Sequence, residues 1–446
     1  MKPAPTPLAL RLALALGLCA LAAAPPAGAN PLDAFGFGSR SMAMGSATTA
    51  TVDDFSANYY NPAALAAAKG LRFELGYVFM KPKLTLNGAD LGVDEHRGFQ
   101  GGFVLPGELF RHRVAFSIGL FLPDRQITRV RALPQSQARF VLYDNRPQRL
   151  VLSSSLAVEI VKGLFVGAGI TFLSNARGAL DITGSVDLLD SDKTVLLSSV
   201  EENLVAVRYP TAGLLWHATD NLRLGLSFRD QFSLVLDVDI LVRGEIVIDG
   251  EPLVEDASFK LRSLSKNLFS PRQLTLGVAW VTPRWLLELD VSWVQWSRFP
   301  PPTASVAIDL DIPELPFTIP GSERIAAPDF HDIIVPRVGA EVLAHDGRHV
   351  ALKLRAGYFF EPTPARAQPG VTAYIDSHKH GVSAGLGLIF KGTAKVFPEP
   401  IELDFAGQFL WMQRREFDKD DPADPLGDVV ARGRYIGGST NLKLLF

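Results

Sequence analysis

A two-residue alternation of apolar and polar side chains constrains the fold of this chain more than any other feature. Between residues 222 and 240 the even positions are apolar except Asp230, and the odd positions are polar, charged or small except Val235. Successive side chains of a β-strand point to opposite faces, so the segment predicts a strand with one apolar face. Ordinary strands end after about 5–6 residues. The length of this pattern instead favours a barrel wall that faces lipid on its outer side.

The same alternation recurs along the chain, for example at 71–79, 287–293, 350–360 and 401–411. We count fourteen such strands, which start near residues 71, 97, 112, 148, 164, 195, 221, 255, 284, 331, 349, 378, 399 and 430. An open sheet edge would leave backbone groups unpaired in hydrocarbon, so the wall has to close on itself. The sequence therefore predicts an all-β fold, a 14-stranded antiparallel transmembrane β-barrel over residues 71–446.

The connections between these strands alternate between short and long. The short ones span 106–111, 161–164, 217–221, 282–284, 345–348 and 392–398, and the long ones 87–96, 123–147, 186–193, 243–255, 299–330, 361–377 and 418–429. Bacterial outer-membrane barrels have short periplasmic turns and long extracellular loops. An even strand count then places both ends of the wall on the periplasmic side. The final strand, with Leu442, Leu444 and Phe446 on its apolar face, is typical of outer-membrane proteins.

Residues 1–29 have the features of a secretory signal peptide, with Lys2 and Arg11 before an apolar run and an A-x-A cleavage site that ends at Ala29. The only cysteine, Cys19, lies inside this segment. The mature chain would therefore have no cysteine nucleophile, thiolate metal site or disulfide. After residue 29 the sequence has no run of about 18 apolar residues, so no transmembrane helix is predicted. The formal net charge of −3 gives no indication of nucleic-acid binding.

Residues 30–70 differ from the rest of the chain. They are rich in Gly, Ala, Ser and Thr, and they contain the acidic pair Asp53-Asp54 and the sequence Asn61-Pro62-Ala63. Ordering each residue costs about 1–2 kcal/mol of backbone entropy, and this segment has little apolar area to offset that cost. We therefore expect it to be held inside the barrel, as a hatch that plugs the lumen, rather than to fold alone. A flexible linker after the signal peptide is the alternative.

The run MAMGSATTATVDDFSANYYNPAALA (residues 42–66) resembles the N-terminal hatch of the outer-membrane long-chain fatty acid transporters, the FadL family, which includes aromatic-hydrocarbon uptake proteins. DVSWVQWSRF (290–299) and RAGYFFEPTPARAQPG (355–370) resemble later parts of the same family. Residues 120–270 match in pattern only. The resemblance implies a passive outer-membrane transporter, porin-like in architecture, for long-chain fatty acids or similar hydrophobic molecules.

The resemblance also implies where the ligand moves. The hatch residues expected to gate transport are Phe35, Phe37, Asp53, Asp54, Asn61, Pro62 and Ala63. Ligand would leave sideways where the third strand kinks inward, and Gly119 is the candidate for that kink. We expect Leu315, Phe317 and Ile319 in the longest loop to collect apolar ligand. Arg229, Arg298 and Arg355 are candidate partners for a carboxylate head group, or they pair with inward acids such as Glu288, Asp290, Glu402 and Asp404.

Two other functions remain possible from the sequence. A barrel of this type could serve as a secretion or surface-assembly partner. It could also be an outer-membrane hydrolase that uses His378 or His380, with Asp376 and Ser377 close by in the sequence. We expect neither: the prediction is no enzyme, no cofactor and no metal. The expected setting is the bacterial outer membrane, as a monomer, with a hydrophobic ligand, outer-membrane lipid and lipopolysaccharide as partners.

Overall fold

The computed structural model describes residues 32, 36–125, 138–140, 149–187, 195–248, 251–299, 305–311, 329–368, 374–392, 399–419 and 427–446. The side chains of 251–268 and 305–311, and of some residues in 175–248, are not described. The predicted signal peptide (1–29), Phe35 and the loop residues Leu315, Phe317 and Ile319 lie outside the described residues.

Fourteen strands form the wall within the described residues. In chain order they are β1 (Arg72–Leu86), β3 (His96–Leu109), β4 (His112–Pro123), β6 (Val151–Val161), β7 (Leu164–Asp187), β8 (Val195–His217), β9 (Leu222–Arg229) continued by β10 (Phe232–Ile248), β11 (Glu251–Ser270) continued by β12 (Gln273–Val281), β13 (Trp285–Val294), β15 (Ile333–Asp346), β16 (Val350–Glu361), β18 (Lys379–Phe390), β19 (Ile401–Phe417) and β20 (Val429–Leu445).

The wall closes because its first and last strands pair. Strand β1 is antiparallel to β20 over its whole length, from Arg72 opposite Leu445 to Leu86 opposite Ala431. Every other wall strand pairs antiparallel with its neighbours in the chain. The prediction of a closed 14-stranded antiparallel barrel is confirmed.

The side-chain alternation has the predicted orientation. On β13 the inward Glu288 and Asp290 are almost fully buried, whereas the outward Leu289 is 52% exposed. Outward apolar residues that no protein group covers are what a lipid-facing wall requires. The buried inward carboxylates show, in turn, that the lumen is filled rather than open.

Two predicted strands are interrupted. The segment 222–240 divides into β9 and β10 at Asp230 and Gln231, and the strand expected from about 255 divides into β11 and β12. The two breaks lie next to one another: Arg272 Nη2 at one break is 2.8 Å from Asp230 Oδ1 at the other. Pro271 has no backbone N–H to donate to a ladder. A proline and an ion pair therefore mark the place where these strands leave the regular wall.

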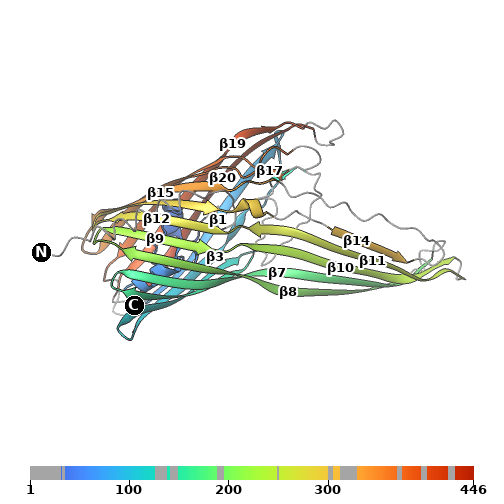
Figure 1. The fold of residues 1–446 in the computed structure, drawn as a ribbon, viewed down its shortest axis with the longest axis horizontal. Coiled ribbons are helices and arrows are strands. Elements are labelled where there is room, and N and C mark those ends of the chain that lie inside the picture. The colour runs from blue at the N-terminus through green and yellow to red at the C-terminus, as the bar shows by residue number, and fades with distance from the viewer. Residues whose placement is uncertain are drawn as a thin grey trace.

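Beyond this point the strands extend far from the barrel (Figure 1). There β10 pairs parallel with β7, from Val238 opposite Gly178 to Val247 opposite Asp187, and β14 (Ser305–Asp311) pairs antiparallel with β11. The long connection predicted at 243–255 was too long, because β10 continues to Ile248 and β11 begins at Glu251. Part of the predicted loop 299–330 likewise forms β14. The extension projects from the end of the barrel opposite to the chain's C-terminus (Figure 1).

Residues 36–70, called the hatch below, lie inside the barrel (blue in Figure 1). They form the short helices α3 (Ser39–Ala43) and α4 (Ala57–Tyr60) and the 3-10 helix η1 (Pro62–Ala67), and nearly all of their side chains are buried. The remaining small elements are β2 (Ala89–Asp90), β5 (Arg139–Phe140), η3 (Trp296–Arg298) and β17 (Tyr374–Ile375). None of the helices in the described ranges has the length and hydropathy needed to cross a membrane.

Candidate functional site

Glycines on the inner face of the wall let the hatch backbone approach closely. A Cβ atom added at Gly167 would lie 2.5 Å from the backbone nitrogen of Ala63, and one at Gly339 would lie 2.5 Å from the carbonyl oxygen of Met44. Both distances are shorter than real carbon contacts allow. The wall is therefore shaped around the hatch at these positions, which the composition of the wall alone did not reveal.

Asn61 organises the fold of the hatch and fixes it to the wall. Its Oδ1 accepts the backbone N–H of Ala63 at 3.1 Å, which caps η1, and Pro62 occupies the first turn of that helix. Its Nδ2 donates to the carbonyl of Thr49 at 2.8 Å and to that of Leu214 in β8 at 3.1 Å. Asn61 therefore both caps η1 and contacts the wall directly.

Two carboxylates of β13 hold the hatch turn 48–51. Asp290 Oδ2 accepts the backbone N–H groups of Thr48 and Thr49, both at 3.1 Å, and the Thr49 hydroxyl at 2.7 Å. Glu288 accepts the N–H of Ala50 at 2.5 Å and the hydroxyl of Thr51. We call this set the β13 latch. The sequence analysis considered these acids as partners for inward arginines, whereas in the structure they accept hydrogen bonds from the hatch.

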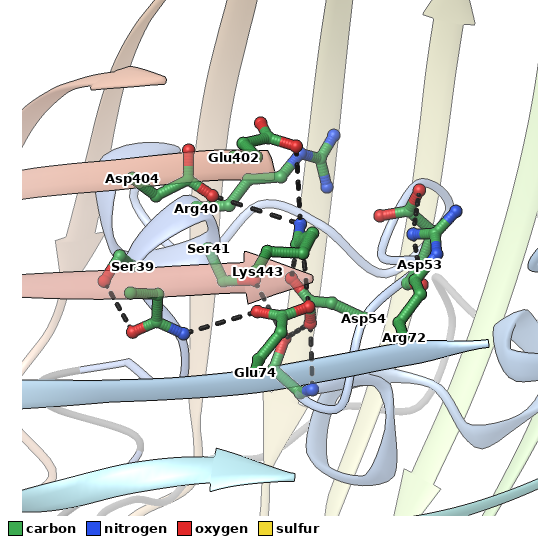
Figure 2. Close-up of polar contacts among 12 residues, drawn as sticks. Ser39, Arg40, Ser41, Asp53, Asp54, Arg72, Glu74, Glu402, Asp404 and Lys443 are labelled. Carbon is green, nitrogen blue, oxygen red and sulfur yellow. Dashed lines mark hydrogen bonds and ion pairs between the residues drawn. The ribbon is translucent and has the colours of Figure 1, made fainter. Parts of the chain in front are cut away.

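Lys443 of β20 lies at the centre of a buried acidic cluster, which Figure 2 shows. Its Nζ is 3.6 Å from Glu74 of β1, and it is 3.9 and 4.0 Å from Glu402 and Asp404 of β19. It is also 4.0 Å from the hatch residue Asp54. One cation thus joins the first strand, the last two strands and the hatch.

Arg355 and Arg40 extend this cluster towards β15. Arg355 is paired with Glu341 at 2.6 Å, with Glu402 at 3.1 Å and with Asp404. The hatch residue Arg40 is paired with the same Glu341 at 3.1 Å. Burial alone would lower the pKa of Arg40, but the nearby carboxylates, Glu341 first, raise it above its usual value. Arg355 therefore serves the structural role that the sequence left open, as a partner of inward acids.

The acidic pair of the hatch divides its contacts between the wall and the hatch itself. Asp53 forms an ion pair with Arg72 of β1 at 2.6 Å. Asp54 Oδ1 accepts the backbone N–H of Ser56 at 2.9 Å and its hydroxyl at 2.5 Å. Through Oδ2 the same carboxylate faces Lys443. Both acids of the motif therefore fix the hatch in the lumen.

A small cavity of about 30 Å³ lies between the hatch and the wall. It is lined by Leu32, Ser46, Thr49, Tyr59, Tyr60, Ser227, Arg229, Gln273, Thr275, Ser292 and Arg337. The Arg229 guanidinium lies 3.8 Å above the ring of Tyr59 and donates to Gln273 Oε1 at 2.6 Å. Arg337 donates to Ser292 Oγ at 2.8 Å. Two guanidinium groups beside one polar cavity form a suitable site for an anionic group.

Tyr60 connects this cavity to the start of the hatch. Its hydroxyl accepts the backbone N–H of Phe37 at 2.9 Å and donates to Ser46 Oγ at 3.2 Å. Burial raises the pKa of Tyr60 to about 12, although both hydrogen bonds act in the other direction. The phenol is therefore neutral near pH 7. Phe37 itself is fully buried and packs edge-on against Phe55, with ring centroids 4.9 Å apart.

Gly119 of β4 lies against the Phe37 end of the hatch. A Cβ added there would be 3.3 Å from the Phe37 ring and from Asn58 Nδ2. Strand β4 pairs through Gly119 with both neighbours, opposite Gly102 of β3 and Ser153 of β6, without a shift of register. The wall is thus closed at Gly119 in this structure, and the sideways exit remains a prediction.

Arg298, the third candidate cation, is exposed at the end of η3 and lines no part of the cavity. Beside it is an aromatic cluster that sequence reasoning missed, made of Phe269, Trp296, Phe299, Phe330 and Tyr374. These residues come from four separate segments of the chain. Only the aromatic content of DVSWVQWSRF could have indicated part of it.

The histidines proposed for a hydrolase do not meet the acid and the hydroxyl that are near them in sequence. His380 hydrogen-bonds with the Tyr358 hydroxyl at 2.8 Å and with Gln413 at 2.9 Å, and His378 accepts the N–H of Thr363 at 3.1 Å. Asp376 is buried and bound to Lys379 and Thr363. Among the described residues no Ser or Asp side chain hydrogen-bonds to either imidazole.

Comparison with known proteins identifies the family. The profile of the family described as "Outer membrane protein transport protein (OMPP1/FadL/TodX)" matches residues 18–435. The chain belongs to this family. The family resemblance inferred from the hatch is therefore confirmed, as is the bacterial outer membrane as its location. No curated protein sequence matches the chain significantly.

Solved structures of the FadL/TodX type share the fold at low sequence identity. A FadL homologue from Pseudomonas aeruginosa is 14% identical, with a TM-score of 0.58 over 92% of this chain and 98% of that one. The toluene transporters TodX of Pseudomonas putida and TbuX of Ralstonia pickettii are each 17% identical, with TM-scores of 0.52 and 0.51, over 92% of this chain and 99% of theirs. The family consists of transport proteins, which is consistent with a protein that is not an enzyme.

Proposed function

We propose that this protein transports long-chain fatty acids or similar hydrophobic molecules passively across the outer membrane. The ligand would be collected by the apolar loop that contains Leu315, Phe317 and Ile319. It would enter the lumen, reach the hatch and leave sideways through the wall. Similar structures include a toluene transporter and a monoaromatic hydrocarbon channel, which supports this class of cargo.

One observation carries the proposal: the cavity that borders Arg229 and Arg337 at the hatch surface. Its volume of about 30 Å³ gives room for a small polar group such as a carboxylate but not for an acyl chain. A carboxylate there would meet two guanidinium groups, each already oriented by a neighbouring side chain. An apolar tail would then need space that only movement of the hatch provides.

The same contacts support a location for this movement. Tyr60 lines the cavity and also binds the backbone of Phe37, whose ring lies against Gly119 of β4. A ligand that displaces Tyr60 would therefore loosen Phe37 beside the third wall strand. This supports residues 30–37 and Asn61 as the moving part and Gly119 as the nearest wall position.

Uptake by cells that express the protein tests the proposal. We expect Arg229→Gln to reduce uptake of radiolabelled oleate several-fold while uptake of an uncharged hydrocarbon changes little. Arg348→Gln, an exposed position in the β15–β16 turn, is the matched control. Asn61→Ala and deletion of 30–37 should alter uptake of both ligands while the barrel still assembles normally. Heat-modifiable mobility on a gel verifies the assembly. Unaltered uptake in all three variants would contradict the proposal.

A further inference from the structure

The outward face of the β1–β20 seam changes from apolar to cationic along its length. Near the periplasmic end the outward side chains are Phe73 and Leu75 on β1 and Leu442 on β20, which are 46%, 53% and 39% exposed. Towards the other end the outward positions are Lys81 and Lys83 on β1 and Arg434 and Arg432 on β20, all exposed. We call these four residues the seam patch.

The register places these cations side by side. Lys83 is directly opposite Arg434, Thr85 is opposite Arg432, and Lys81 is opposite Ile436. Like charges at directly opposed positions of a sheet destabilise it. Such a cluster is therefore expected to be offset by a bound anion.

The protein supplies no such anion in its described part. Strand β20 contains no acidic residue, and the one acid of β1, Glu74, is buried on the inner face. None of the four side chains takes part in an ion pair with a described residue. By contrast, Arg414 at the nearby end of β19 is paired with Glu416, and Arg97 on β3 is paired with Glu95 at 3.1 Å. The seam patch is thus a distinct group among the cations of this rim.

The distance of the patch from the periplasmic end of β1 places it at the outer end of the apolar band, where the head groups of the outer leaflet lie. From Arg72 to Lys81 the strand advances nine residues, and at about 3.3 Å per residue and a tilt of about 40° this gives about 23 Å along the membrane normal. The apolar band of an outer-membrane barrel is about 25 Å tall. Exposed apolar side chains adjoin the patch: Ile436, which is 55% exposed, is opposite Lys81, and Trp411 of β19 is opposite Arg434.

We propose that the seam patch binds the phosphate groups of lipopolysaccharide in the outer leaflet. Four cations next to exposed apolar side chains complement a molecule that has phosphates directly above its acyl chains. A soluble anionic partner would use the cations but not Ile436 and Trp411 beside them. The inference does not depend on which ligand the lumen carries.

Native mass spectrometry of the purified full chain, mixed with diphosphorylated lipid A, tests the proposal. We expect wild type to retain lipid A in preference to phosphatidylglycerol. Lys83→Gln combined with Arg434→Gln should weaken lipid A binding about 30-fold, since two cations are lost and each Lys or Arg near an anionic lipid surface contributes about 1 kcal/mol. Lys83→Arg with Arg434→Lys keeps both charges and should bind as wild type does. Monophosphorylated lipid A should bind more weakly.

The matched control removes two cations from the periplasmic turns, Arg284→Gln with Arg348→Gln, and should leave lipid A binding unchanged. Because all these side chains are exposed, the variants should assemble, which gel mobility verifies. Equal lipid A binding by the Lys83/Arg434 variant and wild type would overturn the proposal. So would a wild type that holds lipid A no better than phosphatidylglycerol.

Discussion

The β13 latch makes a quantitative prediction about the hatch. Replacing Asp290 with Ala removes the acceptor of three hydrogen bonds, from the N–H groups of Thr48 and Thr49 and the Thr49 hydroxyl. Each buried donor left unpaired costs about 1–3 kcal/mol. Relief of the repulsion between Asp290 and neighbouring Glu288, and water entering the space, offset part of this cost. We therefore take the low end, about 3 kcal/mol of lost hatch docking, or about 100-fold in its docking equilibrium.

Hydrogen exchange measured by mass spectrometry detects this change. In Asp290→Ala, peptides that cover 44–55 should exchange about 100-fold faster than in wild type, since opening of the hatch limits their exchange. Peptides from β13 and β12 should keep their protection. Asp290→Asn, which retains one acceptor oxygen, should lie between the two.

Ser292→Ala is the control for the latch. Ser292 is the next inward residue of β13, and its hydroxyl contacts Thr275 and Arg337 rather than the hatch. It should leave exchange in 44–55 unchanged. If Asp290→Ala exchanges in this segment at the wild-type rate while the barrel is assembled, the carboxylate does not hold the hatch and the reasoning fails.

Three further predictions follow from contacts of the hatch and the seam. Asn61→Ala should cost about 2 kcal/mol, because it removes a helix cap and two bonds to carbonyls; exchange of η1 measures this, and unchanged exchange would refute it. Lys443→Met should cost about 3–5 kcal/mol by leaving buried acids without their shared cation, seen as a lower unfolding temperature that Lys443→Arg largely restores; an unchanged temperature would contradict it. Gly339→Ala should displace Met44 and speed trypsin cleavage at Arg40, whereas Gly407→Ala, with open space around its Cβ, should not.

The barrel could be predicted from the sequence because its signal is local. Side chains such as Leu287, Glu288 and Leu289 reveal the inner and outer faces without any knowledge of what pairs with them. Closure followed from the cost of a free edge in lipid. The parallel pairing of β10 with β7 could not be predicted, because the same alternation suits a parallel or an antiparallel neighbour. The break at Asp230 was visible as one polar residue on the apolar face, but its partner Arg272 was not.

The candidate site was predicted less completely. The placement of the hatch inside the barrel followed from its composition, since the segment has too little apolar area to fold alone. Which cation meets which acid did not, because it depends on contacts between residues hundreds of positions apart, as with Arg40 and Glu341. Lys443 received no role, since the last strand was interpreted from its outward residues Leu442 and Leu444. The clusters around the hatch exist only once the wall has closed.

The position of Lys443 links two steps of biogenesis. A single ammonium group touches Glu74 on the first strand and Asp54 on the hatch, while its own strand is the last to be made. The pairing of β1 with β20 is therefore fully stabilised only when the hatch lies in the lumen. The hatch, in turn, is fully held only once β1 and β20 have paired. A barrel that closed without the hatch would leave buried charged groups at the β1–β20 pair without all of their partners, and this disfavours an open pore in the membrane.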